Sequence, residues 1–184
     1  MSIEPLQQAI AVTRGVLTKV TPDQLSAPTP CASWDVAALI NHIVGAQRFF
    51  AAGVDGTEPD RDADVAAGDY VQAFDDGAAA LMVAFGADGV MERMLTLPFG
   101  EMPGAAFAGL ATTDTFQHGW DLAKATGQST DLAPELAEAL LARSKAAIQD
   151  AFRGPEGAPF GPEKTVVDDA PAADRLAAFL GRTV

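Results

Sequence analysis

Three polar residues interrupt an apolar helix face in a pattern that suits metal chemistry. Asp114, His118 and Asp121 follow one another at steps of four and three residues, which places them on one side of a helix. That side is apolar where it begins, at Phe107, and where it ends, at Ala125. Burying polar groups without partners would cost roughly 2–7 kcal/mol for a neutral group and more for a charge. The three side chains therefore need compensating partners, and a bound cation is one candidate.

The other histidine, His42, borders the apolar stripe of an earlier helix, beside Ile43. Facing helices of an antiparallel bundle can bring His42 level with Asp114 and His118. Two imidazoles and one carboxylate, with positions left for water or substrate, form a catalytic ligand set for a divalent metal. Asp121 lies one turn further along and is our candidate catalytic residue. The spacing leaves three roles open for it: a fourth ligand, an outer hydrogen-bond acceptor or a general base.

A plainer interpretation of these residues does not involve a metal. An aspartate and a histidine four residues apart also occur in many helices as a hydrogen-bonded pair, and a lone histidine is commonly a satisfied boundary residue. We interpret Cys31, the single cysteine, as a small packed hydrophobe rather than a reactive thiol, since Pro28 and Pro30 indicate a fixed connector. Trp34 and Trp120 are interpreted as core residues, although each is close in sequence to a candidate ligand.

The elements that must position these residues are helices. Apolar spacing and punctuation by glycine and proline predict helices over 3–20, 33–53, 65–85, 102–126, 132–152 and 172–180, with Ser33 as the N-cap of the second. A short extra turn is predicted over 21–25, a short extended segment over 90–97, and a glycine- and proline-rich crossover over 154–171. The fold class is therefore all-α: a four-helix bundle with long connections and a short extra C-terminal helix.

Composition narrows the class of protein further. The chain has 184 residues, which suits one domain, and 12 basic against 25 acidic side chains give a net charge of −13. That charge argues against nucleic acid as a partner. No apolar run is long enough for a membrane span, and the first residues lack the pattern of a secretory signal. With a single cysteine, no disulfide forms within the chain, so we predict a cytoplasmic protein.

Three stretches together resemble one known family. Residues 29–45, TPCASWDVAALINHIVG, resemble the opening of the DinB-like metal-binding superfamily. Residues 118–127, HGWDLAKATG, and 174–182, DRLAAFLGR, resemble its actinobacterial branch related to the N-terminal domain of mycothiol-dependent maleylpyruvate isomerase. The three stretches span nearly the whole chain, so the resemblance implies that residues 1–184 form a single DinB-like metal-binding helical domain.

The resemblance also implies a metal site with three protein ligands. His42 would be one ligand, and Asp114 and His118 would supply the others. The isomerase branch typically has glutamate where this chain has Asp114, whose side chain is one methylene shorter. Zinc is the ion that the resemblance implies, with nickel as the alternative.

The superfamily that this chain resembles includes enzymes that use low-molecular-weight thiols, so our first hypothesis is a mycothiol-dependent transferase or isomerase-like enzyme. An open coordination position can bind a thiol as its thiolate, which then attacks an electrophilic substrate. Isomerase activity itself is not expected, because the isomerase has a second domain for which this chain leaves no room. The alternatives are a non-enzymatic metal- or small-molecule-binding module and a metal-free structural network. A homodimer through the alanine-rich segment 132–148 is compatible with each of them.

Overall fold

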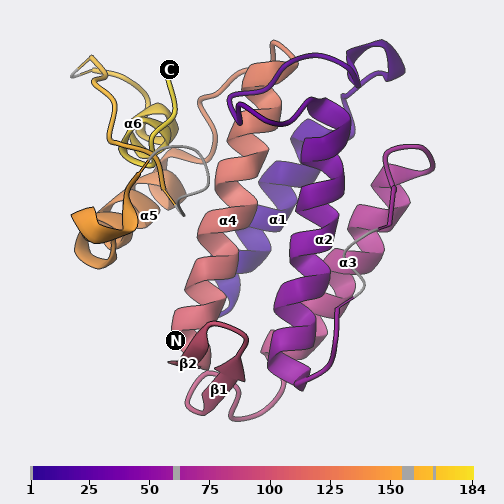
Figure 1. Ribbon diagram of the computed structural model, residues 1–184, viewed down its shortest axis with the longest axis vertical. Coiled ribbons are helices and arrows are strands. Elements are labelled where there is room, and N and C mark those ends of the chain that lie inside the picture. The colour runs from indigo at the N-terminus through magenta and orange to yellow at the C-terminus, as the bar shows by residue number, and fades with distance from the viewer. Residues whose placement is uncertain (1, 60–62, 155–159, 168) are drawn as a thin grey trace.

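The computed structural model describes residues 2–59, 63–154, 160–167 and 169–184, which are mostly helical. Four helices stand side by side as a bundle, and two further helices pack together at its side (Figure 1). The elements in chain order are α1 (Glu4–Leu17), η1 (Pro22–Gln24), α2 (Val36–Asp55), α3 (Tyr70–Gly86), β1 (Met94–Leu97), β2 (Gly100–Pro103), α4 (Gly104–Ala125), α5 (Pro134–Ala147), η2 (Asp150–Phe152) and α6 (Ala172–Phe179). None of the helices in the described ranges is long and apolar enough to cross a membrane. The prediction of an all-α bundle with an extra C-terminal helix is confirmed.

Helix α2 begins later than the sequence pattern indicates. Asp35 is its N-cap, and the carboxylate accepts a hydrogen bond from the Ala38 N–H at 2.8 Å. Ser33 lies in the preceding turn, where the Trp34 N–H donates to the Cys31 carbonyl at 2.9 Å. The prediction of Ser33 as the cap is wrong because the connector closes a turn of its own before the helix starts.

Helices α1 and α4 approach each other closely at Gly119. A β-carbon at this position would lie 2.3 Å from Thr13 Oγ1, so the packing leaves no room for one. The Thr13 side chain is fully buried, and its hydroxyl donates to the Thr115 carbonyl at 2.9 Å. This contact presses the turn of α4 that carries His118 against α1.

The segment before α4 is a β-hairpin, which confirms only part of the extended segment predicted over 90–97. Strand β1 covers its second half and pairs with β2 in antiparallel register, with Leu97 opposite Gly100. Leu95 and Leu97 point into the core, and Gly100 turns the chain with a φ of 122°. Residues 90–93 form a turn instead, closed by backbone hydrogen bonds to Gly89.

Helix α1 ends at Leu17, before the predicted end at residue 20, and α3 and α5 also have boundaries that differ from the predicted ones. Helix α3 begins after the segment 65–69, because Asp69 caps it by accepting a hydrogen bond from the Gln72 N–H at 3.0 Å. Helix α5 ends at Ala147, because the backbone of Ile148 is extended. At the start of α3 and at the end of α5, the apolar spacing extends beyond the point where the backbone changes direction, so the pattern overestimates the length of each helix.

Buried apolar side chains form two clusters, and α4 contributes to both. In the larger cluster, the centroid of the Phe107 ring lies 5.0–6.1 Å from the ring centroids of Phe49, Phe50 and Phe85. The smaller cluster joins α4 to α5 and α6 through side chains such as Trp120. Helix α4 is therefore held on two sides, which fixes the residues on the faces between them.

Candidate metal centre

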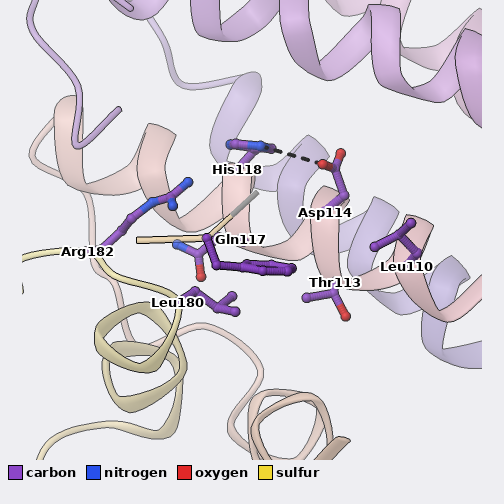
Figure 2. Close-up of a pocket in the computed structure, with 8 residues that line it drawn as sticks. Leu110, Thr113, Asp114, Gln117, His118, Leu180 and Arg182 are labelled. Carbon is purple, nitrogen blue, oxygen red and sulfur yellow. Dashed lines mark ion pairs between the residues drawn. The ribbon is translucent and has the colours of Figure 1, made fainter. Parts of the chain in front are cut away.

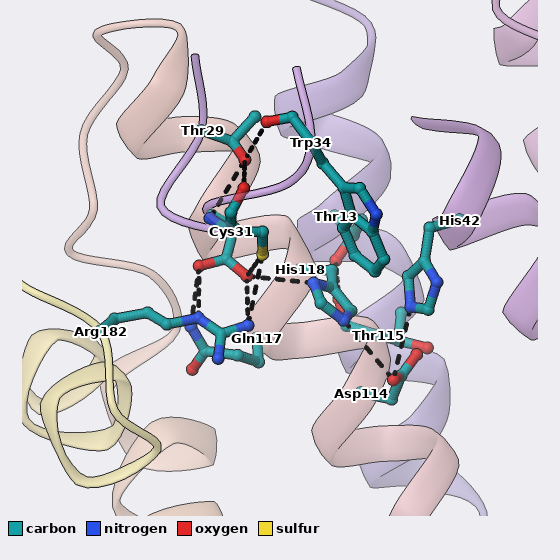
Figure 3. A network of polar contacts seen from close by, with 11 residues as sticks. Thr13, Thr29, Cys31, Trp34, His42, Asp114, Thr115, Gln117, His118 and Arg182 are labelled. Atoms are coloured by element: carbon teal, nitrogen blue, oxygen red, sulfur yellow. Dashed lines mark hydrogen bonds and ion pairs between the residues drawn. The ribbon is translucent and has the colours of Figure 1, made fainter. Parts of the chain in front are cut away.

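The three candidate metal ligands come together between α2 and α4 (Figure 3). His118 Nε2 lies 3.6 Å from Asp114 Oδ1, and His42 Nε2 lies 3.9 Å from the same oxygen. The potential ligand atoms of the three residues all lie within 4.8 Å of one another. The structure thus gathers the residues that the sequence singles out from two separate helices.

The spacing of these atoms suits a shared cation better than direct hydrogen bonds. Both distances to Asp114 Oδ1 exceed hydrogen-bond length. Two ligands on a tetrahedral zinc ion, each about 2.0–2.2 Å from the metal, lie roughly 3.3 Å apart, close to the separations found here. His42 Nε2 is buried and has no hydrogen-bond partner among the described residues. A divalent cation would satisfy this nitrogen after small inward shifts of the side chains, so the donor set fits a metal.

Trp34 packs on the two imidazoles. Its ring centroid lies 4.4 Å from that of His42 at an interplanar angle of 31°, and 5.8 Å from that of His118. The Trp34 side chain is only half-buried, whereas Trp120 is fully buried and donates through Nε1 to Asp174 at 2.8 Å. The interpretation as core is therefore right for Trp120, whereas Trp34 packs against the edge of the core and also covers the candidate site.

Asp121 lies on the opposite edge of the His118 ring from Asp114. Its Oδ2 is 3.0 Å from His118 Nδ1, whereas the Nε2 atom of the same ring faces Asp114. The carboxylate is fully buried and accepts hydrogen bonds from Arg182 Nε at 3.1 Å and Arg182 Nη2 at 2.9 Å. Gln117 Nε2 and Cys31 Sγ complete its surroundings at 3.3 Å each. Of the three roles open to Asp121, this geometry favours that of an outer acceptor.

The connector before α2 places Cys31 in this network (Figure 3). The Thr29 hydroxyl oxygen accepts from the Cys31 N–H at 3.1 Å, and the same hydroxyl lies 2.8 Å from the Trp34 carbonyl. The turn therefore aims the Cys31 thiol at Asp121 and Trp34 at the imidazoles. Cys31 is half-buried and hydrogen-bonded, so its interpretation as a packed hydrophobe is wrong.

Charges within the cluster shift several pKa values. Burial raises the pKa of Asp114, but the neighbouring His118 and His42 outweigh it and bring the pKa below its ordinary value. Burial lowers the pKa of His118, yet Asp114 and the hydrogen bond to Asp121 raise it to about 10. Burial also raises the pKa of Asp121, whereas the bonds from His118 and Arg182 lower it to about 2. The metal-free cluster therefore holds a proton on His118 between two carboxylates.

A second group of potential ligands shares the same histidine: Cys31, His118 and Asp121. Both oxygens of Asp121 already accept hydrogen bonds from Arg182, and Arg182 Nη2 lies 3.5 Å from Cys31 Sγ. A metal ion there would sit beside a guanidinium charge and compete with it for the same oxygens. The group formed with His42 and Asp114 is therefore the better candidate.

A pocket opens next to Asp114 and His118 (Figure 2). It has a volume of about 200 Å³ and is partly open to solvent, which is smaller than the roughly 300–1,000 Å³ of pockets for drug-sized ligands, so it admits only a small organic group. One wall is a stripe of α4, and the other comes from residues on both sides of α6. The lining residues are Leu110, Thr113, Asp114, Gln117, His118, Phe160, Leu180 and Arg182. Part of the predicted crossover over 154–171 thus reaches the pocket, while 155–159 and 168 lie outside the described residues.

Sequence reasoning missed two residues of the polar network. Arg182 shows no local pattern, because its contact with Asp121 joins positions 61 residues apart. Gln117 lies on the same α4 turn as His118 and is almost fully buried. Only its position beside His118 could have drawn attention to it before the structure.

A helical bundle with a histidine–carboxylate cluster between two of its helices is the arrangement that the resemblance to DinB-like proteins implies. The model of the family "Mycothiol maleylpyruvate isomerase N-terminal domain" matches residues 6–123, and the chain belongs to this family. It is a family of metal-binding, mycothiol-associated helical proteins.

Two similar proteins come from Mycobacterium tuberculosis. They are the uncharacterized proteins MT0763, of strain CDC 1551 / Oshkosh, and Rv0738, of strain ATCC 25618 / H37Rv. Each is 46% identical over 189 residues, an alignment that covers 100% of this chain and 97% of the relative. No solved structure matches the chain significantly.

Proposed function

We propose that this protein is a metal-dependent enzyme that joins a low-molecular-weight thiol, such as mycothiol, to an electrophilic substrate. The observation that carries the proposal is the buried His42 Nε2 atom, which has no hydrogen-bond partner among the described residues and faces Asp114 and His118. A metal-binding, mycothiol-associated family supports both parts of the proposal.

In this proposal His42, Asp114 and His118 hold the ion, zinc in preference to nickel. When bound, the metal supplies positive charge that lowers the pKa of a thiol. The sulfur would form a bond to one carbon of an activated double bond as the π electron pair of that bond moves to the neighbouring atom; the thiol proton would leave to solvent, and a proton from solvent would neutralise the carbanion or enolate so formed. Reversal of the same addition after a bond rotation would give isomerisation.

The remaining residues would orient the ligands and shield them from water. Asp121 accepts from His118 Nδ1 and so keeps the ring turned with Nε2 toward the ion. Trp34 covers one side of the imidazoles and excludes water there. The pocket beside Asp114 and His118 is open to a substrate, and its apolar lining, Leu110, Phe160 and Leu180, favours a partly apolar one.

The deciding experiment is metal analysis of protein purified without a histidine tag. We expect about one equivalent of zinc or nickel in the wild type, and loss of that metal in His42→Ala and His118→Ala. Asp88→Asn, a change of an exposed loop carboxylate, is the control and should retain the metal. Metal-loaded protein is then tested for acceleration of thiol addition to a panel of electrophiles. No metal in the wild type after reconstitution, or no acceleration by a loaded protein, would refute the enzyme proposal.

A non-enzymatic binding module is the second candidate, and one observation favours it. The buried carboxylate nearest the ligands, Asp121, is held by Arg182 and His118 and is therefore not free to act as a base. A module of this kind would bind metal and thiol at the same site without accelerating their reaction with electrophiles.

Several further expectations stay predictions. They are the organisation of residues 1–184 as a single domain, a homodimer through the segment 132–148, and a cytoplasmic location.

A further inference from the structure

We propose that Arg182 is a positioning residue of the metal centre, which fixes the Asp121 carboxylate and, through it, the ring of His118. The inference rests on the proposed function for its metal-binding consequence. It assigns a role in the site to the C-terminal segment, which lies beyond the region that the family model matches, residues 6–123.

The contact between Arg182 and Asp121 has the geometry that fixes a carboxylate in one orientation. Nε donates to Oδ1 at 3.1 Å and Nη2 donates to Oδ2 at 2.9 Å, so the planar guanidinium holds both oxygens at once. The Asp121 side chain is fully buried, and the Arg182 side chain is 19% exposed. A paired hydrogen bond of this kind, shielded from water, leaves the carboxylate little freedom to rotate.

The orientation of Asp121 decides where the His118 ring points. Asp121 Oδ2 lies 3.0 Å from His118 Nδ1, so the Nδ1 proton is held on that side and Nε2 is left for Asp114 and the ion. Without Arg182, the buried carboxylate would lose the two hydrogen bonds that fix its oxygens. It would then be free to rotate, which weakens its hold on the imidazole.

Backbone contacts place Arg182 beside Asp121, and these contacts do not depend on the Arg182 side chain. Gly181 has a φ of 99°, a conformation that favours glycine, and the Arg182 N–H donates to the Ala177 carbonyl at 2.9 Å. Arg153 ties the same segment down by donating to the carbonyls of Phe179 at 2.7 Å and Gly161 at 3.0 Å. A substitution at position 182 should therefore remove the guanidinium while leaving the segment docked.

The test compares Arg182→Gln with a matched control, Arg175→Gln, in the full chain. Arg175 belongs to α6 and pairs with Glu138 on the surface, away from the pocket lining. Loss of an outer partner of a metal-bound histidine typically weakens metal affinity by about 10–100-fold. We expect a loss of that size in zinc competition titrations for Arg182→Gln, a smaller loss for Arg182→Lys, and no significant loss for Arg175→Gln.

A double-mutant cycle shows whether Arg182 acts through Asp121. In an Asp121→Asn background, Arg182→Gln should cause little additional loss of zinc affinity, because the group it positions is already gone. An undiminished loss in that background would overturn the proposal. If Arg182→Gln does not fold, Arg182→Lys takes its place in the cycle, since a lysine keeps the charge but not the paired hydrogen bond.

A metal-free measurement separates this proposal from the proposed function. The chain has two histidines, so nitrogen-detected NMR of the imidazoles is readily assigned with His42→Asn. In the metal-free wild type we expect a protected Nδ1–H signal from His118, altered by Arg182→Gln and unchanged by Arg175→Gln. An unaltered signal in Arg182→Gln would overturn the positioning role. Failure of the wild type to bind zinc, with the altered signal still seen, would instead refute the metal proposal alone.

Discussion

A single methyl group added at Gly119 should destabilise the protein, although the same change elsewhere in a helix stabilises it. A β-carbon at Gly119 would lie 2.3 Å from Oγ1, 3.1 Å from Cβ and 3.3 Å from Cα of Thr13. Rotation of the Thr13 side chain can remove only the first of these contacts. The rotation would also break the buried hydrogen bond from the Thr13 hydroxyl to the Thr115 carbonyl.

The magnitude follows from three opposing effects. Overpacking of a core costs about 1–3 kcal/mol, and loss of a hydrogen bond costs about 1 kcal/mol more. Replacing glycine with alanine within a helix stabilises the helix by about 1 kcal/mol, which opposes these losses. The free energy of unfolding of Gly119→Ala should therefore fall by about 1–3 kcal/mol.

Gly15→Ala is the matched control, since Gly15 is an exposed residue of α1 and a β-carbon there meets no atom within 4 Å. This variant should gain up to about 1 kcal/mol. Urea denaturation of both variants gives the two free energies directly. In the combined variant Thr13→Ala with Gly119→Ala, the cost should be less than the sum of the single changes. Equal stabilisation by Gly119→Ala and Gly15→Ala would refute the close approach of α1 and α4.

Three further predictions concern the site and its support. The pKa of His118 is raised to about 10 in the metal-free protein, so the ring is protonated at pH 7.5 and zinc binding should release a proton. The zinc affinity should therefore rise about tenfold for each unit by which the pH increases, up to the pKa of His118. Calorimetry in buffers of different ionisation enthalpy would detect the released proton, and zinc binding without proton release would contradict the prediction. In Trp120→Phe, the emission of the remaining Trp34 should change on zinc addition, because its ring stacks on His42; unchanged emission at saturating zinc would argue against that geometry. Asp174→Ala should lower the free energy of unfolding by about 1–3 kcal/mol, because it leaves the buried Trp120 Nε1 without its acceptor, and a loss below about 0.5 kcal/mol would show that the bond contributes little.

Local spacing explains why part of the candidate site could be predicted. Asp114, His118 and Asp121 share one face because a helix repeats every three to four residues, and this holds whatever the helix packs against. The position of His42 opposite them required only that α2 and α4 be neighbours in the bundle. The bundle itself followed from apolar stripes that have no other way to be buried.

The residues that escaped prediction depend on contacts between distant parts of the chain. Arg182 reaches Asp121 only because α6 docks beside α4, and no periodicity records that contact. Cys31 and Trp34 are directed by the hydroxyl of Thr29, which closes a turn that proline and glycine patterns do not specify. The end of α5 at Ala147 has no glycine or proline to mark it, so the sequence pattern ran on.

The close approach of Gly161 and Gly181 beside the site limits which residues related sequences can have at these positions. A β-carbon at Gly181 would lie 2.6 Å from Gly161 Cα, and the positive φ at Gly181 disfavours other residues as well. A larger residue there would push apart the two chain segments that carry Phe160 and Arg182. We therefore expect positions 181 and 121 to vary together among relatives. A relative without glycine at position 181 should also have replaced the acid at position 121, since the arginine that pairs with this acid would no longer be in place.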